Sequence, residues 1–370
     1  MRVCTSSLLV LLLLACTEKG LPPADGTETA DTGKGTPADS TVGGDSHEST
    51  GGDDSHETGD TGSPPVDLPD CEMGEEDGPA PCSDCRFTQI EATGSGACGL
   101  TTDGDIACWG YSTRRPVDGP YIGLYGGGGN SLCGLRADGR ACCWSESPSY
   151  DEYLAAPGDI AFTSLAPGAY HGCGIDIDDK VRCWGGDIPG PGGDDYGQAD
   201  PPSGTFVMVA AGGIHTCGLR EDHTLACWGV NAENDAWEEG MSDWGQVTDA
   251  PSGTYASVVA GQSGNCAVDD AGMLTCWGFY FDAGDGLFDL AAIDVSFGGI
   301  GTLCIVTDTG DISCDVGWGT SDEVSEEDNT PPTDGPYTQV AIGSSFGCAL
   351  KEDGQLDCWG SNHYGALTPP

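Results

Sequence analysis

The sequence predicts an all-β protein assembled from seven copies of one cysteine-containing hairpin. Three observations support this fold class. Glycine and proline are abundant, with 61 and 23 residues, and no long run of helix-forming residues occurs. Fourteen of the 20 cysteines fall into seven pairs with one common spacing. Nine Trp and 11 Tyr supply the large apolar surface that a folded core requires.

The chain is strongly acidic. Its 370 residues hold 12 Lys+Arg and 60 Asp+Glu, which gives a formal net charge of −48. A field of this sign repels nucleic-acid phosphates and anionic lipid headgroups. We therefore expect no nucleic-acid partner, and contact with a membrane only through a lipid anchor.

Residues 1–15 have the pattern of a secretory signal peptide. A positive charge precedes an apolar run at 8–14, which is too short to span a bilayer as a stable helix. The end of this segment, Leu13-Leu14-Ala15-Cys16, resembles a bacterial lipobox. The resemblance implies a lipoprotein that is cleaved before Cys16 and acylated there, with palmitate among the fatty acids, and Thr17 in the next position favours the outer membrane. The alternative is an ordinary cleaved signal peptide in which Cys16 has no role.

Residues 16–70 are predicted to form a disordered acidic spacer. They hold 13 acidic residues, two lysines and no aromatic residue, so they cannot bury a core. His47 and His56 stand among these carboxylates. Two histidines on a flexible chain seldom make a metal site, and we expect none here.

Residues 71–85 form a cysteine-containing lead-in to the repeats. Cys71, Cys82, Cys85 and Cys142 lie outside the seven pairs, and the sequence does not distinguish their three possible connectivities. Cys82 and Cys85 make a C-x-x-C motif, but neither a second such motif nor a βαβ context accompanies it. We therefore expect a structural bridge in an exported protein.

The cysteine pairs define repeats of about forty residues between residues 86 and 370. The first cysteines of successive pairs are 35 to 49 residues apart, so loops of varying length join copies of one unit. The pairs are Cys98/Cys108, Cys133/Cys143, Cys173/Cys183, Cys217/Cys227, Cys266/Cys276, Cys304/Cys314 and Cys348/Cys358.

The segment CGLTTDGDIACWG, which begins at Cys98, shows how each pair is placed. A three-residue loop at Thr102-Asp103-Gly104, with the glycine in the left-handed conformation, sets Leu100 opposite Ile106 and Cys98 opposite Cys108. Directly opposed residues lie ~4.5–5.5 Å apart at Cα, which a disulfide can span. Each hairpin is therefore predicted to carry its own cross-strand bridge. Small or apolar residues on both faces fit blades stacked around a ring.

The fourth unit carries the most specific pattern. Residues 212–229 read G-x-x-H-x-C-x-L-x-x-D-G-x-x-x-C-W-G, with His223 in place of the turn glycine. This pattern resembles the regulator of chromosome condensation repeat, in its cysteine-containing bacterial secreted form. The resemblance covers residues 86–370 and implies a seven-bladed β-propeller in which the end of unit seven continues into the start of unit one. A further short strand is expected in three units, at 196–198, 244–246 and 364–366.

Three units depart from the pattern. Asp179 and His223 replace the turn glycine, and both residue types tolerate positive φ. The sixth unit has no Trp after Cys314, so we expect a bulged strand there, or Trp318 reaching the same slot from a displaced position.

The sequence lacks familiar catalytic motifs such as G-x-S-x-G and H-E-x-x-H. His171 and His215 hold equivalent positions two residues before a cysteine, and we expect packing roles for them in preference to metal or acid–base roles. Acidic segments at 194–195, 238–239 and 326–328 are expected to form a solvated rim, with Ca²⁺ binding as the alternative. No cofactor, metal or catalytic residue is predicted.

Partner binding is expected where the units differ most. The insertion at 231–243 contains Trp237, Glu238 and Glu239, which the repeat does not explain. A second candidate is the aromatic cluster Phe279-Tyr280-Phe281. Aromatic anchors with a polar rim are typical of protein hot spots. The alternative is that these residues fold back over a blade edge.

The resulting hypothesis is a bacterial outer-membrane lipoprotein, on either the periplasmic or the cell-surface side, that displays a monomeric, non-catalytic propeller. The expected partner is a protein or a cationic polymer. The family that this chain resembles includes a nucleotide-exchange factor for a small GTPase and a secreted β-lactamase inhibitor, so the resemblance does not define the partner. The alternatives are a lyase or hydrolase of envelope polymers on the same scaffold, and a passive envelope component.

Overall fold

The computed structural model describes residues 71–74, 82, 84–111, 113–186, 196–230, 244–279, 290–298, 302–315 and 330–370. All of them belong to one compact unit. The signal peptide, Cys16 and the spacer lie outside the described residues, so the hypotheses on them stay predictions.

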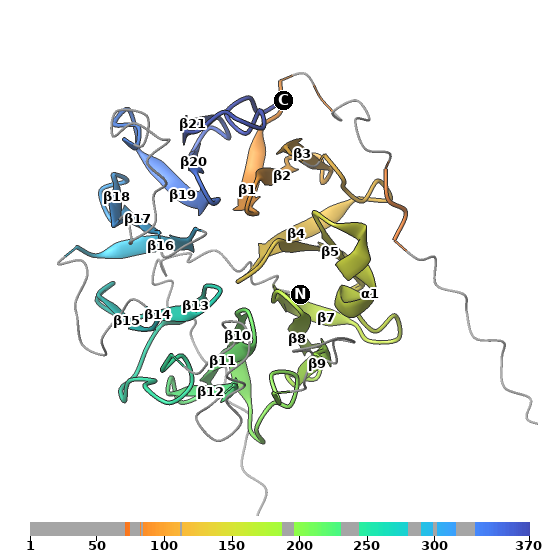
Figure 1. Ribbon diagram of the computed structural model, residues 1–370, viewed down its shortest axis with the longest axis vertical. Helices are drawn as coiled ribbons and strands as arrows, with labels where there is room; N and C mark the ends of the chain where they lie inside the picture. Colours follow the sequence, from red (N-terminus) through yellow and green to blue (C-terminus); the bar gives the residue numbers. More distant parts are fainter. Residues whose placement is uncertain are drawn as a thin grey trace, which may run out of the picture. The chain divides into compact units, whose positions relative to one another are not determined.

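Seven three-stranded antiparallel sheets surround a central axis, and each sheet follows chain order from its inner to its outer strand (Figure 1). This arrangement is a seven-bladed β-propeller, so the predicted fold class is confirmed. A 3₁₀ turn η1 (Pro148–Tyr150) and a four-residue helix α1 (Asp151–Leu154) lie between blades 2 and 3. The strands of blades 1 to 7 are β1 Phe87–Ala92, β2 Gly96–Thr101, β3 Ile106–Gly110; β4 Tyr121–Gly126, β5 Ser131–Arg136, β6 Ala141–Ser145; β7 Phe162–Pro167, β8 His171–Asp176, β9 Val181–Gly185; β10 Phe206–Ala211, β11 His215–Arg220, β12 Leu225–Gly229; β13 Ser257–Ala260, β14 Gly264–Val268, β15 Leu274–Gly278; β16 Ala292–Phe297, β17 Leu303–Thr307, β18 Ile312–Asp315; and β19 Tyr337–Ile342, β20 Phe346–Lys351, β21 Leu356–Gly360.

The predicted hairpin register is confirmed. In blade 1, Cys98 lies opposite Cys108 and Leu100 opposite Ile106. The turn residue Gly104 has φ +86°, a left-handed conformation that an L side chain strains. The other six hairpins pair their two cysteines in the same way.

The two replacements of the turn glycine also behave as predicted. Asp179 and His223 adopt φ values of +59° and +66°. The chain that follows Asp315 in blade 6, including Trp318, lies outside the described residues, so the predicted irregularity there stays open.

Each blade has a disulfide between its second and third strands. These seven bridges join the cysteine pairs Cys98–Cys108, Cys133–Cys143, Cys173–Cys183, Cys217–Cys227, Cys266–Cys276, Cys304–Cys314 and Cys348–Cys358. Cys71–Cys142 and Cys82–Cys85 use the other four cysteines of the described residues, and the first of these ties the lead-in to blade 2. So many disulfides among the described residues place this unit outside a reducing cytoplasm. In the part of the chain that the structure describes, no helix has the length and apolar character needed to cross a membrane.

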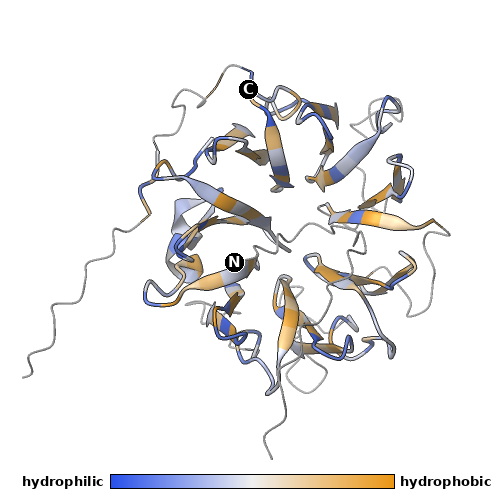
Figure 2. Ribbon diagram, turned by 180° about the vertical axis from the view of Figure 1, so that it is seen from behind, coloured by the Kyte–Doolittle hydropathy of each residue, from blue (hydrophilic) through white to orange (hydrophobic). Residues whose placement is uncertain are grey.

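The hydrophobic core is divided among the interfaces between blades. At the interface of blades 7 and 1, Phe87 and Trp109 pack with Leu350. Gly99 has to be small there, because a Cβ atom would lie 2.3 Å from the Phe87 ring. Hydrophobic residues occupy the strands of every blade, while hydrophilic residues gather in the connecting turns (Figure 2). Each hairpin is thus covered on both sides, as its two apolar faces predicted.

In several blades, the Trp of the third strand donates a hydrogen bond to the chain segment that precedes the blade. The indole N–H of Trp228 donates to the Gln198 carbonyl (3.0 Å), and that of Trp277 donates to the Gln246 carbonyl (3.1 Å). The short strands predicted at 196–198, 244–246 and 364–366 are wrong, because these segments form turns. Their carbonyl groups accept hydrogen bonds from the Trp of the next blade, and the segments do not add a strand to the previous sheet.

Blade 1 is anchored by the end of the chain, so the predicted ring closure is confirmed. The indole N–H of Trp109 donates to the carbonyl of Ala366 (2.9 Å). On the inner strands, the Gln339 side chain accepts from the Ile90 N–H (2.9 Å) and donates to the Ile90 carbonyl (3.0 Å). Side-chain bonds therefore join the facing edges of β19 and β1.

Candidate binding face and axial pocket

The two ends of the propeller have different character. At one end, which we call the hairpin-turn face, the second and third strands of each blade are joined by short turns of one type. At the other end, the loop face, the first and second strands are joined by turns such as 93–95 and 261–263. The outer strands also end on the loop face, since the N–H of Tyr111 bonds to Ser95 and that of Phe279 bonds to Ser263.

Every long insertion of the propeller therefore starts on the loop face. The segments 187–195, 231–243, 280–289 and 316–329 each follow the third strand of a blade. Together they contain sixteen acidic residues and no lysine or arginine. All four acidic insertions thus leave the propeller from the loop-face end of a third strand.

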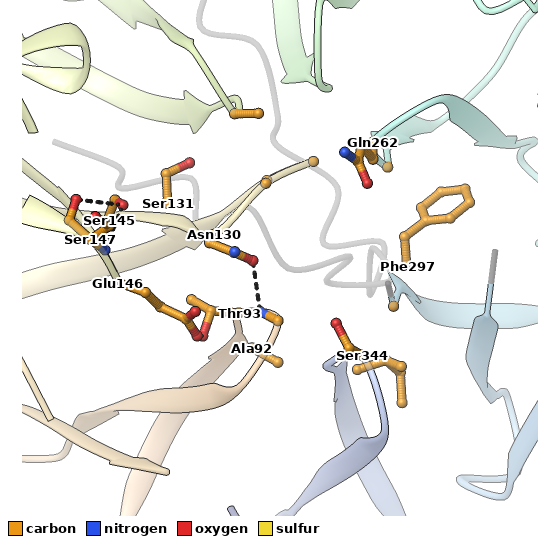
Figure 3. Close-up of a pocket in the computed structure, with 18 of the residues that line it drawn as sticks. Ala92, Thr93, Asn130, Ser131, Ser145, Glu146, Ser147, Gln262, Phe297 and Ser344 are labelled. Atoms are coloured by element: carbon orange, nitrogen blue, oxygen red, sulfur yellow. Dashed lines mark hydrogen bonds between the residues drawn. The ribbon is translucent and has the colours of Figure 1, made fainter. Parts of the chain in front are cut away.

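A pocket of about 410 Å³ opens on the axis at the loop face. Its polar side chains are mostly uncharged, and Gln262, Asn130 and Ser344 reach it from three blades (Figure 3). The Asn130 carbonyl oxygen accepts from the N–H of Gly94 (2.9 Å), and the Phe297 ring forms part of the wall. Glu146 is the one acidic residue among the described lining residues, and its Oε1 accepts from the Thr93 hydroxyl and from the Ser95 N–H (2.9 Å).

A glycine-rich turn of blade 2 crosses the axis beneath this pocket. The N–H of Gly128 donates to the Ala211 carbonyl of blade 4 (3.1 Å). A Cβ atom on Gly127 would lie 1.5 Å from the Pro167 carbonyl oxygen, so the turn can approach blade 3 only without side chains. The turn separates the axial pocket from a second cavity of about 110 Å³ between the inner strands.

Two carboxyl groups, the largely buried Glu91 and the buried Asp294, line this inner cavity. Burial raises the pKa of Glu91 to about 8, with a further contribution from the nearby Asp294 charge, against the effect of a hydrogen bond from Gly126. Burial also raises the pKa of Asp294 to about 7, although the Val340 N–H donates to it (2.8 Å). No ion pair among the described residues includes either group.

No sequence motif marks either carboxyl group. Glu91 lies opposite Cys98, and the same register position opposite the first cysteine holds Ala166, Ala210 or Ala341 in other blades. The remaining blades hold Tyr125, Val259 and Ser296 there, so an acidic residue at a position that is uncharged in the other six blades was the available signal.

His171 and His215 are fully buried between blades and do not line the axial pocket. Nε2 of His171 lies 2.7 Å from Oγ1 of Thr216, which itself donates to the Gln198 carbonyl. The hydroxyl therefore accepts and His171 Nε2 donates. His215 Nε2 makes the matching contact with Oδ1 of Asn265 (2.8 Å). Burial, followed by the His215 charge, lowers the pKa of His171 to about 3, so it stays neutral as an inter-blade link.

The family model for the regulator of chromosome condensation (RCC1) repeat matches residues 337–366, which span β19 to the turn after β21. The last blade is an RCC1 repeat. The resemblance proposed from the fourth unit is thereby confirmed. No curated protein matches the chain.

Several solved structures resemble this propeller. The ectodomain of the receptor kinase CR4 from Physcomitrella patens has 22% identity and a TM-score of 0.55, and the match covers 75% of this chain and 74% of that one. The CRINKLY WD40 ectodomain of the Arabidopsis thaliana receptor kinase ACR4 has 25% identity and a TM-score of 0.42, with 55% and 68% covered. Yeast RCC1 (Prp20), solved with Kap60, has 16% identity and a TM-score of 0.40, with 76% and 71% covered. The CR4 likeness supports the propeller fold.

Most residues predicted to bind a partner lie outside the described residues. These are Trp237, Glu238, Glu239, Tyr280 and Phe281, together with the acidic segments considered for Ca²⁺. Phe279 is described, and it packs on Trp244 with 4.8 Å between ring centroids. Trp244, which the repeat pattern explained as structural, is 46% exposed.

A second aromatic pair stands at the equivalent junction between blades 7 and 1. Tyr111 and Tyr364 are 65% and 47% exposed, with ring centroids 5.1 Å apart. At the junction of blades 3 and 4, the equivalent Tyr196 is buried against Ile214 and Val230. Two of these three junctions thus present aromatic rings to solvent on the loop face.

Proposed function

We propose that this protein is a cell-envelope lipoprotein whose propeller binds another protein through the loop face without catalysing a reaction. Cys16 carries the lipid and holds the chain at the outer membrane, and the acidic spacer separates the anchor from the propeller. The protein acts as a monomer. Its partner presents a basic surface, either on a protein or on a cationic polymer.

The observation that carries this proposal is the difference between the two ends of the propeller. The second and third strands are joined at the hairpin-turn face by near-identical short turns. The loop face has the axial pocket, the exposed rings of Trp244, Tyr111 and Tyr364, and the third-strand ends from which the four divergent segments depart. Binding residues are commonly carried by loops on a rigid scaffold, and the disulfides in every blade supply such a scaffold here. Exposed aromatic rings are the residue type that anchors protein interfaces.

The charge of the molecule supports a basic partner. From Cys71 onward the chain has 9 Lys+Arg and 47 Asp+Glu, a formal charge of −38. Such a field attracts a basic surface and makes the association rate fall with added salt.

The test is capture of envelope and secreted proteins on the immobilised propeller, followed by kinetics with variants. Trp244→Ala on the loop face should weaken binding at least tenfold. Ile177→Ala, which removes a 67% exposed side chain on the hairpin-turn face, should leave binding unchanged. Equal effects of the two variants would contradict the proposal.

The divergent segment 231–243 provides a second set of variants. Glu238→Gln combined with Glu239→Gln should slow association, and Trp237→Ala should mainly speed dissociation. If neither set of substitutions nor added salt alters the binding kinetics, the segment 231–243 is not part of the binding surface. Turnover of an envelope polymer by the purified protein would contradict the non-catalytic function.

A further inference from the structure

We propose that the axial pocket binds a neutral saccharide. The inference goes beyond the proposed function, because the pocket lies at the centre of the ring and neither Trp244 nor Phe279 lines it. Its volume of about 410 Å³ falls within the range of about 300–1,000 Å³ that is typical of small-molecule sites.

The polar side chains around the pocket have hydrogen-bonding groups that the protein itself does not use. Within the part of the chain that the structure describes, the exposed side chains of Gln262 and Ser344 make no hydrogen bond. The Oδ1 atom of Asn130 accepts from the Gly94 N–H (2.9 Å), and its Nδ2 group is left to donate. These groups face the pocket from three blades (Figure 3). Amides and hydroxyls both donate and accept, and so do the hydroxyl groups of a sugar.

Aromatic rings stand beside these polar groups. Phe297 forms part of the wall, and Tyr111, which also lines the pocket, is 65% exposed. Tyr364 contacts Tyr111 edge to face, with 76° between the ring planes. The C–H groups on one side of a pyranose ring are attracted to the negative face of an aromatic ring. The pocket thus offers partners for both the hydroxyl groups and the C–H surface of a sugar.

The charges favour a saccharide that is neutral. No lysine or arginine stands among the described lining residues, so an anionic ligand has no counter-charge there. The formal charge of −48 on the whole chain repels acidic sugars as well. The one lining carboxylate in the described residues belongs to Glu146, and its Oε1 already accepts from Thr93 and Ser95.

The backbone of the rim argues against a peptide as the occupant. Peptides that bind in extended form pair with a row of free main-chain N–H and C=O groups. At this rim the main-chain groups are bonded from blade to blade. The Ser344 N–H donates to the Gly94 carbonyl (2.8 Å), and the Gly213 N–H donates to the Gln262 carbonyl (3.0 Å). Recognition in the pocket therefore depends on side chains that converge on a compact ligand.

The experiment is calorimetric titration and saturation-transfer NMR with the disulfide-bonded full-length protein. The probes are three neutral disaccharides: cellobiose, maltose and N,N′-diacetylchitobiose. At least one of them should bind in a saturable way, and saturation should reach the C–H protons of its sugar rings. Cellobiouronic acid and N-acetyl-triglycine amide should bind at least tenfold more weakly than the best disaccharide. Absence of saturable binding by all three disaccharides, or equal affinity for either control, would overturn the proposal.

Variants then locate the site. Gln262→Ala removes an exposed amide, and Tyr111→Leu keeps an apolar side chain but removes the ring. Each should weaken the bound disaccharide at least fivefold, with an unchanged melting temperature because both side chains are exposed. Tyr111→Phe keeps the ring, and Ile177→Ala lies on the hairpin-turn face, so both should bind as the wild type does. Binding that is unaffected by Gln262→Ala and by Tyr111→Leu would overturn the assignment of the site.

The outcome is separable from the proposed function. A captured protein that is lost with Trp244→Ala, together with no disaccharide binding, would refute the saccharide pocket alone. Disaccharide binding that depends on Gln262, without any captured partner that depends on Trp244, would refute the proposed function alone.

Discussion

Replacing Glu91 by Gln should reveal the free energy that the buried carboxyl group costs the propeller. Burial raises its pKa from the ordinary 4.5 to about 8. Since a tenfold change in an equilibrium constant is worth about 1.4 kcal/mol, ionisation of this group in the folded protein costs roughly 5 kcal/mol. Gln keeps a side-chain oxygen for the Gly126 N–H and does not ionise.

The sign of the effect follows from the protonation states. Below pH 4.5 the carboxyl group is protonated in both the folded and the unfolded chain, so it adds no cost. Between pH 4.5 and 8 the unfolded chain loses the proton while the folded chain keeps it, and stability falls as pH rises. Above pH 8 the full cost is present. The Gln variant should therefore gain about 3 kcal/mol relative to the wild type at pH 7 and about 5 kcal/mol at pH 9.

The measurement is the free energy of unfolding by guanidinium chloride at pH 4, 7 and 9 with all disulfides intact. Asp103→Asn, on an exposed turn, controls for the loss of one formal negative charge. A difference between wild type and Glu91→Gln that stays constant from pH 4 to pH 9 would refute the reasoning.

Four further predictions concern other parts of the chain. Trp109→Phe leaves the Ala366 carbonyl without its indole donor, so the free energy of unfolding should fall by about 1–3 kcal/mol; an unchanged value would show that this bond does not stabilise the ring. The pKa of His171 is lowered to about 3, so wild type should lose stability relative to His171→Gln as the pH falls from 6.5 toward 3. Denaturant titrations should show a loss of up to roughly 5 kcal/mol. A difference in unfolding free energy that does not change with pH would argue against a buried neutral imidazole. Gly127→Ala should lower the melting temperature, since the new methyl group meets the carbonyl of Pro167. An unchanged melting temperature would show that the glycine-rich turn does not pass this close to Pro167. Mass spectrometry of the mature protein should find a diacyl- or triacyl-modified Cys16, whereas an unmodified N-terminus downstream of it would contradict the lipoprotein hypothesis.

The charge distribution and the disulfides suggest how the molecule combines rigidity with recognition. Each blade is closed by a bridge that depends on one local register, so the loops on the opposite end can diverge without altering the sheet. The insertions that follow the third strands have diverged in this way, whereas the turns between the second and third strands have kept one length.

The sequence by itself determined the hairpins. The Asp-Gly turn and the alternation of side chains fix which residues of two consecutive strands face each other, and both are properties of about a dozen consecutive residues. The pairing of Cys98 with Cys108 followed from this local geometry, as did the positive φ of Asp179 and His223. The repeat count followed as well, because each unit contains its own pair of cysteines.

Only the tertiary structure decided the features that depend on neighbouring blades. The segment 196–198 is a turn and not a strand because its carbonyl group accepts from Trp228 of the next blade. Glu91 and Asp294 lie in blades 1 and 6, and their raised pKa values arise from burial that the closed ring creates. The exposure of Trp244 likewise depends on which junction it occupies. These features join residues up to about 250 positions apart, as in the bonds between Ile90 and Gln339, and no local pattern specifies which blades meet when the ring closes.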